Sequence, residues 1–75
     1  MREDPGRAQL KAELRDTEER VAHGERDIAH LAVMVARLEA LGAADQTAPK
    51  ALDALRRSQV LFVDERDRLR RALDR

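Results

Sequence analysis

The sequence contains no cysteine, tryptophan or tyrosine, and its single aromatic residue is Phe62. Without cysteine, disulfide bonds and thiolate zinc sites are excluded. The lack of aromatic residues argues against a sheet protein, because strands favour aromatic and β-branched side chains. Ala, Leu, Arg, Glu and Asp dominate instead, which is the composition of long helices and coiled coils. We therefore expect an all-α fold.

A net charge of either sign is also missing, since 15 basic residues balance 15 acidic ones. No overall field therefore draws the chain to nucleic acid or to an anionic membrane. No apolar run reaches the roughly 18 residues that span a bilayer, and no hydrophobic signal segment follows the N-terminus, so we expect a cytoplasmic protein. Thirteen of the 15 basic residues are arginine, which together with the many alanines favours a GC-rich bacterial source.

Apolar residues recur at alternating spacings of three and four along two segments, which is typical of helices that pack along a seam. In the first segment the seam runs through Leu10, Leu14, Thr17, Val21, Gly24, Ile28, Leu31, Val35 and Leu38. In the second it runs through Leu52, Leu55, Gln59, Phe62, Arg66, Leu69 and Leu73.

These seams predict one helical-hairpin domain over residues 7–75, after a disordered leader of residues 1–6. Helix 1 is expected at about 7–41 and helix 2 at about 48–74. Gly42 stands where a C-cap glycine belongs, and Asp45 or Thr47 is a plausible N-cap for helix 2. The turn, residues 42–47, is short enough to make the helices antiparallel neighbours.

Facing residues should then have numbers that sum to about 90, which pairs Ile28 with Phe62, Gly24 with Arg66 and Leu31 with Gln59. We interpret Gly24 as a packing glycine rather than a hinge. Gln59 either sets the register as a buried polar contact or lies at the edge of the seam with its amide in water, and we favour the second. The predicted hairpin core consists of Ile28, Leu31, Val35, Leu38, Leu55, Phe62 and Leu69.

The stretch HLAVMVARLEAL, residues 30–41, carries more apolar side chains than one seam uses. A stripe of small residues gives helix 1 a second apolar face beside its seam. The Val60–Val63 run likewise gives helix 2 apolar side chains outside its seam. A lone hairpin would leave these side chains in water, which monomers seldom do. Leu10 and Leu14 also extend beyond the expected reach of helix 2. We therefore predict a homodimeric four-helix bundle whose subunit interface includes Val33, Met34, Val60 and Val63, its orientation left open.

Few residues suggest chemistry. His23 and His30 stand seven apart, whereas helical metal pairs use spacings of three or four, so we expect surface histidines and no metal site. The sequence has no Gly-rich phosphate loop and no Glu-x-x-His motif. It also has no Ser/His/Asp triad whose members come from different secondary-structure elements. We therefore predict no catalytic residues, no bound cofactor and no enzymatic activity.

The C-terminal segment is the one basic region, with seven arginines against four acids in residues 56–75. Its arginines are weak candidates for contacting RNA or DNA phosphates. The alternative, which we favour in the absence of stacking aromatic residues, is a solvated helix end whose basic side chains suit the helix dipole. The candidates are Arg66, Arg68, Arg70 and Arg71.

Three stretches, GERDIAH at 24–30, ARLEALG at 36–42 and DERDRLRRAL at 64–73, resemble a group of short, uncharacterised bacterial helical-hairpin proteins. The LAVMV stretch and a turn without Gly-His-Asp-Thr depart from that pattern, and the group implies no activity. In shape alone, the expected hairpin is similar to a plasmid copy-number protein that dimerises into a four-helix bundle and binds RNA loops.

The sequence therefore predicts a non-enzymatic protein-interaction or regulatory module built on a dimeric hairpin. Two alternatives stay open. One is nucleic-acid binding through the C-terminal arginines. The other is an adaptor or antitoxin that docks its apolar stripe on an unidentified protein partner.

Overall fold

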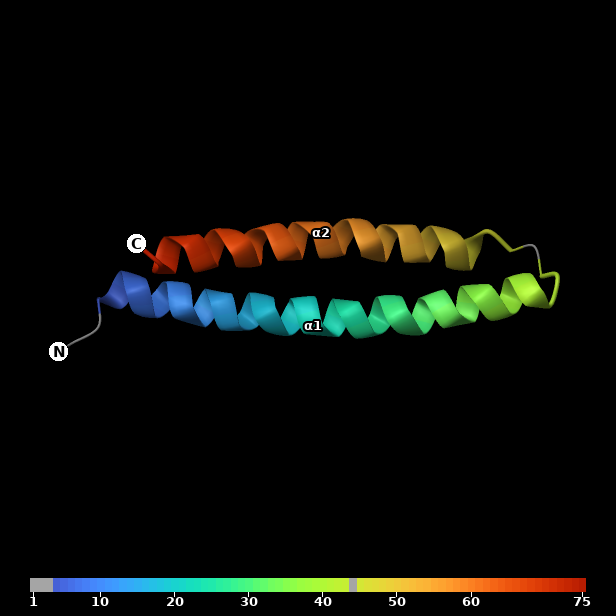
Figure 1. The fold of residues 1–75 in the computed structure, drawn as a ribbon, viewed down its shortest axis with the longest axis horizontal. Coiled ribbons are helices and arrows are strands. Elements are labelled where there is room, and N and C mark those ends of the chain that lie inside the picture. Colours follow the sequence, from blue (N-terminus) through green and yellow to red (C-terminus); the bar gives the residue numbers. More distant parts are fainter. Residues whose placement is uncertain (1–3, 44) are drawn as a thin grey trace.

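The computed structural model describes residues 4–43 and 45–75, and these form two helices and no strand. Helix α1 spans Pro5–Ala40 and α2 spans Thr47–Leu73. The helices lie side by side and antiparallel (Figure 1), as a rod with principal extents of 62 × 15 × 15 Å. The predicted two-helix hairpin is confirmed. Neither helix has an apolar stretch long enough to cross a membrane within the described residues.

Helix α1 begins two residues earlier than predicted. The Asp4 carboxylate accepts a hydrogen bond from the N–H of Gly6 at 3.1 Å, and Pro5 occupies the first helical position. An aspartate cap followed by proline is a strong helix start, because proline lacks only an N–H that would be unpaired there. Assigning residues 4–6 to a disordered leader was therefore wrong, while residues 1–3 lie outside the described part.

The turn is defined by hydrogen bonds at both of its ends. Gly42 has φ of 73°, and the N–H groups of Gly42 and Ala43 donate to the carbonyls of Glu39 and Leu38 at 3.0 and 2.9 Å. This pair of bonds is a Schellman motif, which stops α1. At the start of α2, the N–H of Thr47 donates to the Asp45 carboxylate at 2.8 Å.

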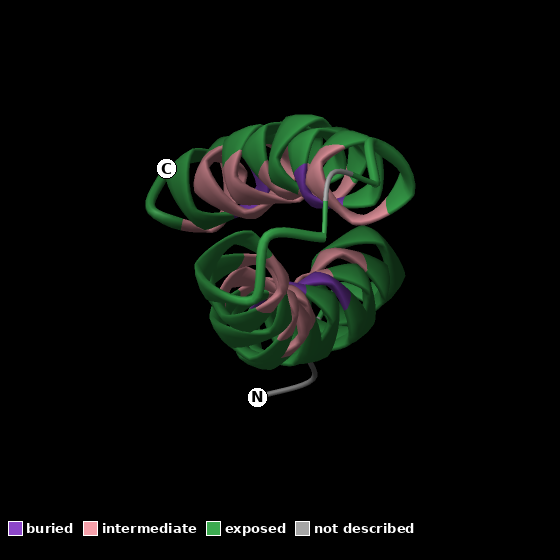
Figure 2. Ribbon diagram, turned by 90° about the vertical axis from the view of Figure 1, so that its right-hand side faces the viewer, coloured by how far each residue is buried: buried purple, intermediate pink, exposed green. Residues whose placement is uncertain are grey.

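Only four described residues are buried, and all four lie on the two predicted seams: Thr17, Val21, Leu52 and Leu69. Figure 2 shows the buried and half-buried positions facing the space between the helices, with exposed positions outside. Of the seven predicted core residues, only Leu69 is buried; the other six are half-buried. A single neighbouring helix covers the centre of a seam and leaves its flanks in solvent.

The rod exposes more surface than a compact protein of its mass. Its accessible surface is 5954 Å², whereas a compact 8.5 kDa monomer would expose about 4,700 Å². Its radius of gyration is 17.4 Å, against about 11 Å for a compact chain of this length. The hairpin therefore closes a thin core by itself.

Candidate interaction surface

Gln59 of α2 makes a partly buried hydrogen bond to α1. Its Nε2 donates to the backbone carbonyl of Val21 at 2.8 Å, in a partly buried position. Its Oε1 lies so close to Gly24 that a Cβ there would overlap it. The predicted pairings of Gly24 with Arg66 and of Leu31 with Gln59 are therefore wrong. The expectation that the Gln59 amide lies in water is also wrong.

Two further contacts join the helices, and the one made by Phe62 supports the same register. Arg70 Nη2 lies 3.1 Å from Glu18 Oε2, and the Arg20 guanidinium lies over the Phe62 ring at 6.0 Å from its centre. Phe62 thus lies against Arg20, which is two helical turns before Ile28, the residue predicted to face Phe62. Residues in contact here have numbers that sum to about 83 instead of 90, so α2 is displaced along α1 by about one heptad. The Gln59 amide then reaches the carbonyl of Val21, one turn before Gly24, where the missing side chain leaves room for it.

The shifted register also changes the two ends of the rod. Since Arg70 pairs with Glu18, the last turn of α2 lies level with the early turns of α1 (Figure 1). Leu10 and Leu14 are both half-buried. The prediction that these leucines lack a partner within the hairpin is therefore wrong, and they give no separate reason for a second subunit.

The arginine-rich end of α2 is largely paired with acids. Arg66 Nη2 lies 3.1 Å from Asp67 Oδ1, and Arg68 Nε donates to Glu65 Oε2 at 2.9 Å. The second bond holds the pKa of the Glu65 carboxyl below its ordinary value. With Arg70 bound to Glu18, three of the four candidate nucleic-acid arginines have acidic partners. This neutralisation weakens the case for a phosphate-binding stripe.

Five large apolar side chains are exposed on the rod. Val33 and Met34 on α1 are 51% and 45% exposed, and Val60 on α2 is 58% exposed. The fourth predicted interface residue, Val63, is half-buried. The predicted interface omitted Leu41 and Leu61, which are 82% and 68% exposed. Their positions outside the seams were the signal that could have added them.

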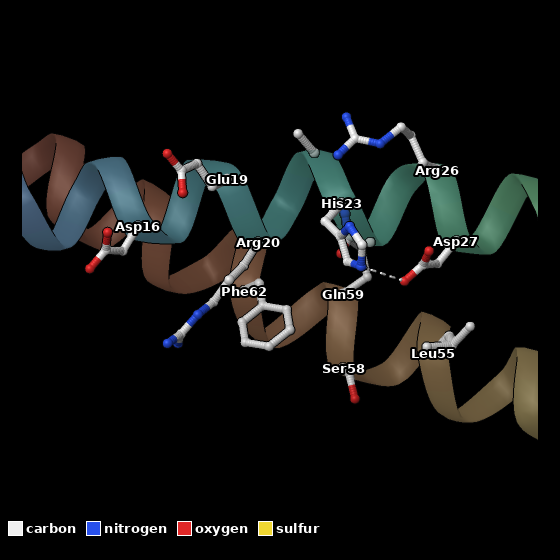
Figure 3. Close-up of a pocket in the computed structure, with 12 residues that line it drawn as sticks. Asp16, Glu19, Arg20, His23, Arg26, Asp27, Leu55, Ser58, Gln59 and Phe62 are labelled. Atoms are coloured by element: carbon white, nitrogen blue, oxygen red, sulfur yellow. Dashed lines mark ion pairs between the residues drawn. The ribbon is translucent and has the colours of Figure 1, made fainter.

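An open groove between the helices brings together residue types that also occur in active sites (Figure 3). His23 Nε2 lies 3.1 Å from Asp27 Oδ2, and Ser58 lines the same groove from α2. Within residues 4–43 and 45–75 no hydrogen bond joins Ser58 to His23, so no nucleophile is paired with a base. No three metal-ligating side chains gather anywhere in this described part. The groove thus gives no catalytic constellation to build on.

Comparison with protein-family models, curated proteins and solved structures finds no match to this chain. The resemblance to short bacterial helical-hairpin proteins therefore stays a prediction. What the protein does must be inferred from its own surfaces, of which the exposed apolar residues are the most distinctive.

Proposed function

We propose that the chain is a non-enzymatic protein-interaction or regulatory module whose working form is a homodimeric four-helix bundle. The observation that carries this proposal is the exposure of five large apolar side chains on a rod with only four buried residues. Moving an apolar side chain of this size from full exposure to full burial contributes about 1.5–3 kcal/mol, and these side chains, 45–82% exposed, would contribute part of that. A second hairpin would cover those that share the face on which it packs, and would close an open flank of the seams.

The exposed area is sufficient for such a dimer. The hairpin exposes about 1,300 Å² more than a compact monomer of equal mass. A stable interface of standard size takes about 800 Å² from each partner. The formal net charge of zero also means that two copies do not repel each other at long range.

Thermal unfolding at several protein concentrations tests this proposal. Because dimerisation stabilises the folded form by mass action, the midpoint temperature of a dimer rises with concentration. We expect a clear rise over a hundredfold range of concentration. A midpoint that stays constant over that range would overturn the homodimer and leave the adaptor or antitoxin alternative, in which the apolar residues await a different chain.

A further inference from the structure

The two sides of the hairpin seam differ in chemistry. The seam residues of both helices occupy positions a and d of a heptad repeat, abcdefg. Residues at position e therefore line one side of the seam, and residues at position g line the other. Because the helices are antiparallel (Figure 1), the e residues of α1 and α2 lie on the same side, and so do the g residues. We call these the e side and the g side.

The e side is mostly charged, and its charges are complementary within one chain. It consists of Lys11, Glu18, Glu25, Ala32, Glu39, Pro49, Arg56, Val63 and Arg70. Its glutamates all lie on α1 and its arginines all lie on α2. Arg70 Nη2 lies 3.1 Å from Glu18 Oε2, and a shallow hollow beside this pair is also lined by Glu25 and Arg66. The e side therefore joins the two helices through charges of its own chain.

The g side carries fewer charges and more apolar surface. It consists of Glu13, Arg20, Asp27, Met34, Leu41, Ala51, Ser58, Glu65 and Ala72. Met34 is 45% exposed, and Leu41, the C-cap residue of α1, is 82% exposed. Leu61, which is 68% exposed, stands three residues after Ser58 and four before Glu65, so it borders the same side.

The open groove of Figure 3 lies on the g side. Arg20 and Asp27 line it from α1, and Ser58 lines it from α2. The seam residues Leu55 and Phe62 also line this groove, and both are only half-buried. The seam is therefore open to solvent along the side that carries the exposed Met34 and Leu41.

The other two exposed apolar residues lie elsewhere. Val60 stands four residues after Arg56 and three before Val63, so it borders the e side. Val33 occupies position f, on the face of α1 away from the seam. The five exposed apolar side chains therefore do not form one face, and three of them belong to the g side.

We infer that a second copy of the chain docks on the g side. This inference rests on the proposed homodimer and names its docking face. Two g sides that face each other cover the open seams of both hairpins, as a two-fold interface between identical patches requires. The surface in excess of a compact monomer, about 1,300 Å², exceeds the roughly 800 Å² that each partner of a stable dimer buries. Docking on the e side would instead strip water from glutamates and arginines, which is unfavourable.

The docking face narrows the interface that the sequence predicted. Of its four residues, only Met34 lies on the g side. Val63 belongs to the e side, Val60 borders it, and Val33 lies on the outer face of α1. Two of the predicted interface residues thus have sequence neighbours, Met34 and Leu61, that lie on or beside the docking face while they themselves do not.

Glutamate substitutions at these adjacent positions test the docking face by sedimentation equilibrium. We expect Met34→Glu and Leu61→Glu each to weaken the dimer at least tenfold, because each places a charge on or beside the g side. The matched controls are Val33→Glu and Val60→Glu, which should leave the dimer unchanged. All four positions are exposed in the single hairpin. Glutamate favours helix as well as methionine, leucine or valine does, to within a few tenths of a kcal/mol, so the helices should still form.

The outcomes separate this inference from the proposed function. A wild-type chain that is monomeric at all concentrations overturns the homodimer itself. A wild-type dimer that Met34→Glu and Leu61→Glu leave intact keeps the homodimer and overturns the docking face. Equal weakening by all four substitutions also overturns the docking face. Circular dichroism of each variant checks that a change in mass reflects lost association and not lost helix, and Leu61→Glu tests the face from α2 independently of Met34→Glu on α1.

Discussion

The Gln59 amide occupies the space that a side chain on Gly24 would need. The amide donates to the carbonyl of Val21, one turn before Gly24 on the same helix. Its Oε1 is buried without a hydrogen-bond partner in the described residues. The arrangement holds α2 at one position along α1, since sliding either helix by a turn would bring a side chain of α1 against this amide.

Gly24→Ala should therefore destabilise the hairpin, although alanine is the better helix former by about 1 kcal/mol. The added methyl group displaces the Gln59 amide and breaks its hydrogen bond, and a displaced buried amide costs about 1–3 kcal/mol. We expect a net loss of about 1 kcal/mol in urea unfolding. In a Gln59→Ala background the same substitution should instead stabilise by about 1 kcal/mol. A stabilising effect in both backgrounds would mean that the two residues are not coupled.

Leu69→Ala should reduce the free energy of unfolding more than any exposed substitution. Leu69 is fully buried, with 0% of its surface accessible. Truncating a buried leucine costs about 2–5 kcal/mol, a large share of what so thin a core provides. Leu69→Met preserves volume and should cost less than about 1.5 kcal/mol. Equal losses for the two variants in urea unfolding would contradict the tight packing inferred at this position.

Gly42→Ala should destabilise the turn. Gly42 has φ of 73°, a left-handed conformation that costs a residue with a Cβ about 1–2 kcal/mol. No atom lies within 4 Å of the added Cβ, so the loss would come from the backbone conformation alone. Gly42→Asn should lose less, because asparagine tolerates this conformation. Thermal unfolding at fixed concentration compares the two, and a larger loss for asparagine would refute the explanation.

Acid should destabilise the folded chain. The backbone N–H of Thr47 holds the pKa of Asp45 below its ordinary value, and the hydrogen bond from Arg68 does the same for Glu65. A carboxyl group with a lowered folded-state pKa stabilises the fold above its unfolded-state pKa. That stabilisation is lost as the pH falls through the folded-state pKa. We therefore expect unfolding curves measured between about pH 6 and 3 to show falling stability below about pH 4, with a smaller fall in Asp45→Asn. A variant that follows the wild-type curve would remove Asp45 as a contributor.

The two helices and their turn were predictable because the spacing of apolar residues fixes which face of each helix is buried. The same spacing does not fix how far one helix slides along the other. A displacement by a whole heptad keeps every seam residue on the seam, so the spacing alone does not choose between the two registers. The choice depends on the Gln59 amide, whose place beside Gly24 is a three-dimensional fit. The start of α1 could have been predicted from Asp4 and Pro5, because aspartate is a common N-cap and proline is favoured at the first helical position. The exposed apolar residues were largely visible as those outside the seams.

The molar mass of the wild-type chain in solution tests the central claim most directly. Sedimentation equilibrium over a dilution series through the micromolar range should give twice the 8.5 kDa mass of the chain, because a second copy is expected to cover exposed apolar side chains. A mass that stays at 8.5 kDa at every concentration would contradict self-association as the role of this surface.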